Sequence, residues 1–455
     1  MKKYEDYQES GIFFKHIPAH WEIKRGKDVI DILSGYPFAS ELFDIDATLG
    51  FPLIRIRNVV TGATDTFYKG DVLPEYVINA GDILIGMDGD YNCAMWNSEP
   101  ALLNQRVCRV KGKNGLLDKY LFYSLPSHLQ IINDLTYFTT VKHLSSNDIK
   151  GISLPVPPLA EQRAIAAYLD HKTAQLDTLL AQKETLLRKL HQKRQALINE
   201  AVTRGLDTNA PRKPSGVAWL GDVPAHWEVK KLKYLFDASL GGGTPDTTND
   251  KFWNGDLPWV SPKDMKSPII SATQDYVTEL AVKSSSTNLI PEKSVIVVVR
   301  SGILKHTFPV AINTIPVTLN QDMKALVPNG LITAEYLAQL LKGFQQHILT
   351  QCTKIGATVD SIEMEWLYSF PLPVPPRAEQ ERIVAYLEKS NERINEATST
   401  IHTQIQTLKA YRQALISEVV TGKVDMRTAR PAPAPTPSEQ ASPPAQPAGR
   451  QLGLF

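Results

Sequence analysis

The sequence has no excess of charge of either sign. Its 455 residues include 49 basic and 48 acidic side chains, which gives a formal net charge of +1. Proteins that bind nucleic acid are often strongly basic, so this balance excludes a uniformly basic chain. It does not exclude a local basic face, because affinity for phosphate groups depends on where the Lys and Arg side chains lie.

Long apolar segments are also absent. No stretch approaches the ~20 apolar residues that a membrane-spanning helix requires, and the longest purely apolar run is VIVVV at 295–299. The first residues, MKKYEDYQESG, lack the apolar core of a signal peptide. We therefore expect a cytoplasmic chain without a membrane span.

Cysteine is scarce. Cys93, Cys108 and Cys352 are scattered, and none of them forms a CxxC pair. Three isolated thiols make neither a disulfide framework nor a zinc site. The sequence therefore fits a reducing compartment and predicts no metal site.

The sequence repeats itself. The pentapeptide PAHWE begins at Pro18 and again at Pro224, within the similar segments SGIFFKHIPAHWEIKRGKDV and SGVAWLGDVPAHWEVKKLKYLF. Further along, LPVPPLAEQRAIAAYLD returns as LPVPPRAEQERIVAYLE, and RQALINEAVTRGLD returns as RQALISEVVTGKVD. Both later pairs are separated by 218 positions (372 − 154 and 412 − 194). The chain therefore contains two copies of one unit, with a spacer of constant length.

The segments between PAHWE and LPVPP differ between the copies. They share only short echoes, such as LNQ at 103–105 and 319–321, and they span 137 positions in the first copy and 149 in the second. Neutral drift after an old duplication would also produce divergence, but it should have blurred the flanking segments as well. We therefore favour a constant frame that carries two variable heads of divergent specificity.

A long helix is predicted after each LPVPP segment. Proline cannot lie inside a helix, and about 45 residues without proline or glycine follow in each copy. Apolar residues there recur at alternating steps of four and three, which is typical of a coiled-coil seam. The seam positions are Leu176, Leu180, Lys183, Leu187, Leu190, Arg194, Leu197 and Ala201 in the first copy, and Ile394, Thr398, Ile401, Ile405, Leu408, Arg412, Leu415 and Val419 in the second.

The two helices are expected to pair with each other. Each would reach roughly 60–70 Å at 1.5 Å per residue, and the return of the chain through the second head makes an antiparallel pair the simplest geometry. The alternative is that each helix packs on its own head, although such helices are usually nearer a dozen residues long. Arg194 and Arg412 in the seam would either fix the register or bury only their aliphatic stems.

Each head alternates short β-rich runs with turn signals. Strands are predicted at 51–59, 81–87, 257–260 and 294–300, and short helices at 117–127 and 333–341. The predicted fold class is therefore α+β: two globular mixed α/β domains are joined by two long helices that form an antiparallel coiled coil.

This combination of motifs resembles the specificity subunit of type I restriction-modification systems. The resemblance rests on the two variable heads, the two long helices, the repeated PAHWE, and the LPVPPLAEQ and LPVPPRAEQ segments, and it covers essentially residues 1–427. It implies that each head is a target recognition domain for one half of a split, asymmetric DNA site. It also implies that the helices set the gap and dock two methyltransferase subunits, with restriction subunits joining outside.

The resemblance divides the chain into five parts. These are target recognition domain 1 at 1–153, the central helix at 154–208, target recognition domain 2 at 209–371, the distal helix at 372–427, and a tail at 428–455 that is rich in Pro and Ala and should be disordered.

Residues able to read base edges or clamp phosphates are plentiful in the heads. Arg and Lys suit guanine edges, while Asn suits adenine. The candidates in the first head are Arg55, Arg57, Asn58, Asp88, Tyr91, Asn92, Lys142 and His143, and those in the second are Thr244, Lys263, Asp264, Arg300, Lys305, His306 and Lys354. Each could equally be a solvated surface residue, so they are proposed as a set.

Two further motifs have a structural interpretation. The run Gly241-Gly242-Gly243-Thr244-Pro245 lacks both the Walker and the Rossmann spacing, which favours a tight turn beside the DNA over a cofactor cradle. His20 and His226, beside Trp21 and Trp227 in PAHWE, are expected to fix the start of each head rather than to catalyse a reaction.

The chain ends in QLGLF. This pentapeptide is similar to the motif that binds the bacterial replication sliding clamp, and an apolar peptide on a flexible tether can dock in a groove of a partner. Clamp binding through Gln451, Leu452, Leu454 and Phe455 is one interpretation, and an inert tail is the other.

Two rival functions remain. An enzyme with its own methyltransferase activity would need a cofactor-binding Gly loop and an Asn/Asp-Pro-Pro-aromatic tetrapeptide, but Val156 and Val374 precede the two Pro-Pro pairs of the frame. The sequence therefore predicts no cofactor and no catalytic residues, although a fused methyltransferase or nuclease remains the alternative. A coiled-coil scaffold that binds only proteins is the second rival.

Overall fold

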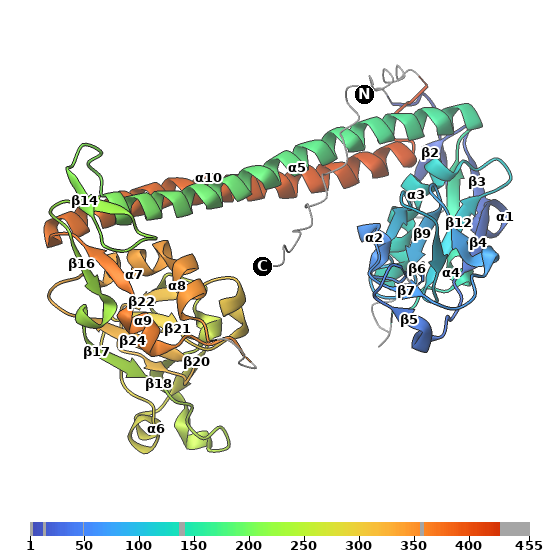
Figure 1. The fold of residues 1–455 in the computed structure, drawn as a ribbon. Helices are drawn as coiled ribbons and strands as arrows, with labels where there is room; N and C mark the ends of the chain where they lie inside the picture. Colours follow the sequence, from blue (N-terminus) through green and yellow to red (C-terminus); the bar gives the residue numbers. More distant parts are fainter. Residues whose placement is uncertain (1–2, 12–14, 49, 136–141, 355–358, 428–455) are drawn as a thin grey trace. The chain divides into compact units, whose positions relative to one another are not determined.

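The computed structural model describes residues 3–11, 15–48, 50–135, 142–354 and 359–427 (Figure 1). The chain divides into two compact units, Met1–Gln182 with Gln404–Phe455, and Lys183–Thr403. Each unit contains one head together with part of each long helix. Within the described residues, no helix combines the length and apolar character that crossing a membrane requires.

The first head contains a four-stranded antiparallel sheet and a five-stranded mixed sheet. In sheet order, the four-stranded sheet comprises β10 (Cys93–Met95), β9 (Ile83–Gly86), β12 (Val107–Gly112) and β4 (Ile30–Ser34). The five-stranded sheet comprises β5 (Phe43–Asp44), β7 (Phe67–Tyr68), β6 (Phe51–Ile54), β11 (Ala101–Leu103) and β8 (Val77–Ile78). The helices of this head are α1 (Gly26–Val29), α2 (Asn58–Thr61), α3 (Asp118–Leu135) and α4 (Ser146–Gly151).

Strand β9 is the centre of this head because both of its faces are buried. Successive side chains of a strand point to opposite faces. Ile83 and Ile85 lie in the same core cluster as Tyr120 of α3, whereas Leu84 lies in the cluster with Leu103 of the second sheet. The head is therefore layered as helix, four-stranded sheet and five-stranded sheet.

The second head repeats this arrangement. Its larger sheet comprises, in order, β17 (Phe236–Gly241), β24 (Met323–Pro328), β21 (Val295–Val298), β22 (Val310–Asn313) and β19 (Ile269–Ile270), and its smaller sheet comprises β20 (Asp275–Val277), β18 (Trp253–Val260) and β23 (Thr318–Leu319). The helices are α6 (Glu279–Ser284), α7 (Ala334–Gly343), α8 (Gln345–Cys352) and α9 (Met364–Ser369).

The central strand of the second head shows the same alternation. In β21, Val295 and Val297 face the core that contains Leu337 of α7, while Ile296 faces the core that contains Val260 of the smaller sheet. Strands β4-β12-β9-β10 therefore correspond to β17-β24-β21-β22, although the two heads share little sequence.

One predicted strand extends too far. The sequence predicts a single strand at 51–59, but β6 ends at Ile54 and α2 begins at Asn58. The side chain of Asn58 accepts a hydrogen bond from the Arg55 backbone N–H at 3.0 Å and donates one to the Ala63 carbonyl at 2.9 Å. These hydrogen bonds stabilise a turn in a segment whose β-favouring residues predict a continuous strand.

The frame of each copy begins with paired strands. Strand β3 (Glu22–Arg25), which starts at the last residue of PAHWE, pairs antiparallel with β13 (Ser153–Val156) of the LPVPP segment. The second copy pairs β16 (Glu228–Lys231) with β25 (Pro371–Val374) in the same way. Each pair is preceded by a hairpin, β1 (Tyr7–Glu9) with β2 (His16–Pro18) and β14 (Arg212–Pro214) with β15 (Asp222–Pro224).

The long helices begin where the prolines end. Helix α5 (Leu159–Arg204) has 46 residues and α10 (Arg377–Val420) has 44. In unit 1, Arg412 of α10 donates from Nε to Asp177 of α5 at 3.1 Å. In unit 2, Arg194 of α5 donates to Asn395 of α10 at 2.5 Å. Moving Asp177 and Arg194 by 218 positions gives Asn395 and Arg412, so the two bonds are equivalent and both belong to one antiparallel register.

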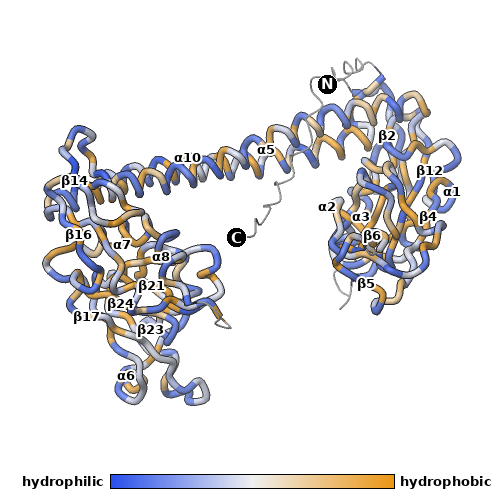
Figure 2. The backbone as a smooth tube through the Cα atoms, viewed as in Figure 1, coloured by the Kyte–Doolittle hydropathy of each residue, from blue (hydrophilic) through white to orange (hydrophobic). Residues whose placement is uncertain are grey.

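The apolar seam of both helices is covered, while most other positions at 177–193 and 395–411 are exposed. Every seam position named above is buried or half-buried, and Ile394, Ile401 and Ile405 are each 6% exposed. Figure 2 shows the same contrast, with hydrophobic residues recurring along helices that are otherwise hydrophilic. The antiparallel coiled coil is therefore confirmed, and the helix ends also join the head cores, as Leu169 and Leu415 do in the first.

The glutamate of the repeated AEQ tripeptide connects each long helix to the PAHWE segment of the same copy. His20 of the first PAHWE contacts Glu161 with Nε2 at 2.8 Å, and His226 of the second contacts Glu379 at 2.7 Å. Glu161 is 6% exposed, so the imidazole shields a carboxylate that burial would otherwise disfavour. This contact agrees with the structural interpretation of both histidines.

The glutamine of AEQ bonds to the head through backbone atoms alone. The Gln162 side chain accepts from the Leu117 N–H at 2.8 Å and donates to the carbonyls of Gly115 at 3.0 Å and Pro157 at 2.9 Å. Because Leu117 immediately precedes α3, this glutamine fixes the start of the helix that covers the first head.

The second copy makes the same three bonds. The Gln380 side chain accepts from Thr333 N–H at 3.0 Å and donates to the carbonyls of Leu331 at 2.9 Å and Pro375 at 3.0 Å. Thr333 caps α7. The two glutamines are 1% and 0% exposed, so both sets of bonds are sealed from water.

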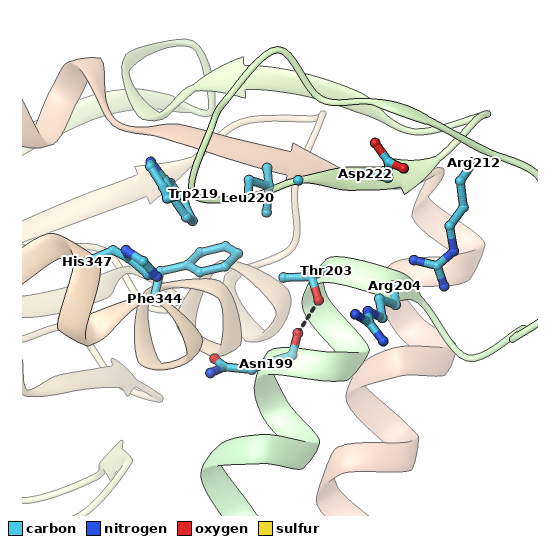
Figure 3. A pocket seen from close by; sticks show the side chains of 10 residues that line it. Asn199, Thr203, Arg204, Arg212, Trp219, Leu220, Asp222, Phe344 and His347 are labelled. Carbon is cyan, nitrogen blue, oxygen red and sulfur yellow. Dashed lines mark hydrogen bonds between the residues drawn. The ribbon is translucent and has the colours of Figure 1, made fainter.

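A pocket lies at the end of α5 in unit 2 (Figure 3). It has a volume of about 640 Å³ and lies between the end of α5, the β14–β15 hairpin and α8. Figure 3 shows Trp219, Phe344 and His347 gathered on one side, with Arg204 and Arg212 on the other. The Trp219 and His347 rings stack with centroids 4.4 Å apart. The pocket is therefore lined both by the repeated frame and by the start of α8 in the second head.

Candidate nucleic-acid interface

Three side chains of the first head meet where β9 ends and β12 begins. Asp88 follows β9, Arg106 precedes β12, and His143 forms an isolated bridge with Asp88. Asp88 Oδ1 lies 2.7 Å from His143 Nδ1 and 3.3 Å from Arg106 Nη1. We call these three residues the first strand-end cluster.

A second contact extends this cluster. Lys142, next to His143, donates from Nζ to Asn133 Oδ1 at 2.6 Å, and Asn133 donates to the Gly89 carbonyl at 2.9 Å. Gly89 has a φ of 76°, in the region that favours glycine. The loop after β9 is therefore held on α3 through its backbone, with cationic side chains beside it.

The second head has a corresponding site. Arg300 follows β21, Asp322 precedes β24, and Ser361 forms an isolated bridge with Arg300. Arg300 Nε donates to Asp322 Oδ1 at 2.6 Å. A pocket of about 720 Å³ is lined by these residues and Lys354. We call Arg300, Asp322 and Ser361 the second strand-end cluster.

The structure thus brings together some of the candidates predicted from sequence. Asp88, Lys142 and His143 lie together in the first head, and Arg300 and Lys354 in the second. Cationic, anionic and hydrogen-bonding groups at the exposed end of a sheet can contact base edges and phosphates. Whether these residues bind DNA stays a prediction.

Two candidates of the first head serve the fold instead. Asn58 is 6% exposed, and both ends of its amide bond to backbone within the α2 turn. Tyr91 is 2% exposed and packs in the core cluster of α3 and β9. Both side chains are therefore engaged in the fold, and whether either of them contacts DNA stays a prediction.

The remaining candidates of the first head lie outside the cluster. Arg55 is half-buried and Asn92 is exposed. Arg57 is exposed and forms an ion pair with Asp65 at 2.6 Å. An exposed ion pair contributes little to stability, so the Arg57 guanidinium can exchange this carboxylate for a phosphate at little cost.

In the second head the other candidates are spread over several loops. Lys263 forms an ion pair with Asp275 at 2.6 Å, and this hydrogen bond raises the pKa of the lysine. Asp264 closes a capping box with Ser261, accepting from its backbone N–H at 2.9 Å, so its carboxylate serves the fold. Lys305 and His306 are exposed at the end of a short 3-10 helix.

The triple-glycine segment does not form the predicted tight turn. Residues 241–245 contain no turn, and none of the three glycines has a positive φ. A Cβ on Gly242 would lie 2.0 Å from the Leu319 carbonyl oxygen. The glycines therefore allow two backbones to cross closely, while the adjacent Thr244 hydroxyl donates to the Gln321 side chain.

Arg106 and Asp322 are not among the candidates predicted from sequence. A signal for both was present, because each follows directly after an LNQ tripeptide, at 103–105 and at 319–321. The glutamate and glutamine of AEQ are likewise absent from the predicted site residues. The four residues of the QLGLF hypothesis, Gln451, Leu452, Leu454 and Phe455, lie outside the described residues.

Within the described part of the chain, no three His, Cys, Asp or Glu side chains group as metal ligands. Cys108 is buried and Cys93 is half-buried, and desolvation of the thiols raises the pKa of each to about 12. These thiols therefore stay protonated and unreactive near neutral pH.

The chain matches one protein family twice. The profile of the type I restriction modification DNA specificity domain matches residues 18–188 and 224–407, which together form most of the chain and contain one head each. The chain belongs to this family.

Relatives in bacteria and archaea agree with this assignment. The chain is 34% identical to the type I restriction enzyme EcoR124I/EcoR124II specificity subunit of Escherichia coli, over 67% of this chain and 72% of the relative. It is 45% identical to the EcoBI specificity subunit of the same species, over only 38% of this chain and 37% of the relative. The MjaVIII specificity subunit of Methanocaldococcus jannaschii is 24% identical over 90% of this chain and 94% of the relative.

A solved structure has the same fold as this family member. It comes from a study of complex assembly and conformational transition in a type I restriction-modification system. The two chains superpose with a TM-score of 0.65 at 19% identity, over 90% of this chain and 99% of the other. At this identity the likeness concerns the fold alone.

Proposed function

We propose that this chain is the non-catalytic DNA-specificity subunit of a type I restriction-modification complex. Each head would read one half of a split, asymmetric DNA site. The observation that carries the proposal is the combination of one repeated frame with two heads that share the order of four central strands and differ in the exposed residues at their strand ends. In this role the chain would act in the cytoplasm, where chromosomal DNA is accessible.

The principal experiment maps methylated bases across the genome of cells with and without this gene. The proposal expects one bipartite motif, with two unlike halves at a fixed gap, to disappear on deletion and return with the wild-type gene. A scaffold that binds only proteins would leave every methylated motif in place. Loss of a single undivided motif would also contradict the proposal.

The paired helices are proposed to set the gap between the half-sites. Inserting three seam-matched heptads into both helices, between Gln182 and Lys183 and between Thr403 and Gln404, preserves the 3.5-residue seam. The 21 added residues lengthen each helix by about 31 Å, which corresponds to roughly nine base pairs, close to one turn of the duplex. Genome mapping should find a gap longer by about that amount between unchanged half-motifs.

Two methyltransferase subunits are the proposed direct partners, with restriction subunits joining them. Support comes from the repetition of the frame, because two equivalent surfaces suit two copies of one partner. Co-purification with a tagged methyltransferase subunit, followed by native mass spectrometry, should give two methyltransferase chains for one specificity chain. A ratio of one to one would contradict this stoichiometry.

The absence of catalysis is tested on the isolated chain. Incubation with labelled S-adenosylmethionine and DNA should transfer no methyl group, whereas the complex reconstituted with methyltransferase subunits should do so. Transfer by the isolated chain would favour the enzyme alternative.

The QLGLF tail is proposed as a second, separate binding element for the sliding clamp. Deleting Gln451 to Phe455 should abolish pull-down of purified clamp while leaving methylation unchanged. Equal pull-down by the deleted and the full-length chains would show that this tail end is inert.

A further inference from the structure

The two strand-end clusters occupy equivalent places in the two heads. In the first head, Met87 N–H donates to the Arg106 carbonyl at 2.8 Å, and in the second, Val299 N–H donates to the Asp322 carbonyl at 2.8 Å. The strand registers agree as well, because Val107 pairs with Gly86 and Met323 pairs with Val298. Arg106 therefore corresponds to Asp322, and Asp88 to Arg300.

The charges at these equivalent positions are exchanged. In the first head the residue after the central strand is the acid Asp88 and the residue before the neighbouring strand is the base Arg106, 3.3 Å apart. In the second head the base Arg300 comes first and the acid Asp322 second, 2.6 Å apart. The first head therefore carries its arginine at the start of the neighbouring strand, and the second head carries it after the central strand, although the two strand pairs correspond.

The bond to Asp322 prepares Arg300 for a planar acceptor. It uses Nε, so within the described part of the chain the two terminal NH₂ groups remain for another partner. The Arg300 side chain is 55% exposed and Asp322 is 22% exposed, so the guanidinium is the more accessible partner of the pair. A guanidinium held in this way offers a two-donor fork that matches O6 and N7 of guanine in the major groove.

The first cluster holds its arginine differently. Arg106 donates from Nη1 to both oxygens of Asp88, at 3.3 and 3.4 Å, and His143 Nδ1 lies 2.7 Å from the same carboxylate. Arg106 has a φ of 70°, a conformation that costs a residue with a side chain about 1 kcal/mol or more. Glycine or asparagine would relieve this strain, so stability does not explain an arginine here.

Stability does not explain the exchanged ion pairs either. Both arginines are 55% exposed, and pairs as exposed as these contribute on the order of 0–1 kcal/mol. What the exchange does alter is the position from which each head offers its donor fork.

We propose that Arg300 reads a guanine in the half-site of the second head and Arg106 a guanine in that of the first. Asp322 and Asp88 are the positioning residues that orient the two guanidinium groups. The exchange between strands makes one fold select differently placed guanines. This inference rests on the proposed function, because it names the specificity-determining residues of the heads.

The test replaces each arginine by lysine, which keeps the charge but loses the fork. Cells that lack the gene are complemented with wild type, Arg300→Lys, Arg106→Lys or the control Arg377→Lys, and their methylated motifs are mapped. Arg377 is a matched control because it is 60% exposed and pairs with an acid, Glu381, at 3.4 Å, but lies on α10.

The expected result is specific to one half-motif. Arg300→Lys should make one G·C position of the second half degenerate, with discrimination reduced roughly 10- to 100-fold, and leave the first half and the gap unchanged. Arg106→Lys should do the same to the first half alone. Arg377→Lys should leave both halves intact.

A further variant tests the positioning residue. Asp322→Asn removes a negative charge near phosphates, so the affinity for unrelated duplex DNA should rise, while discrimination at the Arg300 position should fall. A merely structural role would lower the affinity for specific and unrelated DNA together, and that result would overturn the positioning role.

Other outcomes decide the proposal in distinct ways. If wild-type cells show no bipartite motif, the proposed function itself fails. If the motif is present but Arg300→Lys and Arg106→Lys leave it intact, or if neither half contains a G·C pair, the inference is overturned. If a variant abolishes methylation, the purified complex is tested instead. Its preference between competing duplexes that differ at single G·C pairs then decides whether the arginine reads a guanine. Preferences within twofold of wild type overturn the inference, and a tenfold loss supports it.

Discussion

Gln380 is the residue whose loss should separate the second head from its helix most cleanly. It is 0% exposed, and its side chain bonds to the backbone of Thr333, Leu331 and Pro375 at 2.9–3.0 Å. Gln380→Ala leaves one buried N–H and two buried carbonyls without this partner. Thr333 is the cap of α7, so the damage should fall on the start of that helix.

The size of the effect follows from the number of bonds. Each buried polar group that loses its partner costs about 1–3 kcal/mol, while the ordering entropy of a glutamine side chain, about 1.5–2 kcal/mol, is no longer lost on folding. With about 1.5 kcal/mol for each of the three groups, the net destabilisation of unit 2 should be about 3 kcal/mol. Gln162→Ala should cost unit 1 a similar amount, because Gln162 makes the same three bonds and is 1% exposed.

Hydrogen exchange of single amides is the suitable assay, because it separates the two heads. Gln380→Ala should speed exchange of the Thr333 amide by roughly 100-fold and leave the Leu117 amide unchanged, while Gln162→Ala should show the reverse. Gln406→Ala, on an exposed position of α10, serves as the control and should alter neither amide.

Two results would refute this reasoning. Exchange within threefold of wild type at the Thr333 amide in Gln380→Ala would show that water or another group replaces the glutamine. Equal acceleration at both amides in either variant would show that the heads do not respond independently.

Three further predictions concern the frame. Gly422→Ala should destabilise the chain more than Gly221→Ala in thermal unfolding. Both glycines have a positive φ, 73° and 65°, at which a side chain costs about 1–2 kcal/mol. A Cβ on Gly422 would also lie 2.3 Å from the proline ring of the first PAHWE, which adds about 1–3 kcal/mol. Burial lowers the pKa of His128, so the contribution of the neutral imidazole to the free energy of unfolding is fully present above the ordinary histidine pKa and declines as the pH falls through it. His128→Gln should flatten this decline in unfolding curves measured between pH 7 and pH 5. Asp177→Ala should cost at most about 1 kcal/mol in thermal unfolding, because its ion pair with Arg412 is 55% and 36% exposed, and a loss above about 2 kcal/mol would contradict this.

The frame could be predicted from sequence because its signals are local. Prolines stop strands β13 and β25, the apolar seam repeats every 3.5 residues, and the 218-residue shift relates both helices. The heads were harder. Several of their strands have only two residues, such as β7 (Phe67–Tyr68) and β23 (Thr318–Leu319), and strands this short form because neighbouring strands pair with them rather than through a pattern of their own.

The candidate site was predictable in part, for a physical reason. Arg300 and Asp88 follow buried apolar runs, so their place at strand ends was visible in the sequence. Tyr91 and Asn58 looked similar but are buried, because burial depends on which other elements cover a loop. The shared LNQ tripeptide marks Arg106 and Asp322 as equivalent positions, but their role depends on ion pairs with residues 18 and 22 positions away (106 − 88 and 322 − 300), which the sequence does not reveal.

The same frame can carry unlike heads because its two buried glutamines form hydrogen bonds with backbone groups of the heads rather than with their side chains. Gln162 and Gln380 bond only to N–H and C=O groups, which every residue except proline supplies. A head can therefore change its side chains freely without losing these bonds, provided that the backbone before its covering helix keeps its course. The strand-end clusters lie on the sheet and its loops rather than at this attachment, so substitutions there change what a head offers to a ligand without loosening its hold on the helices.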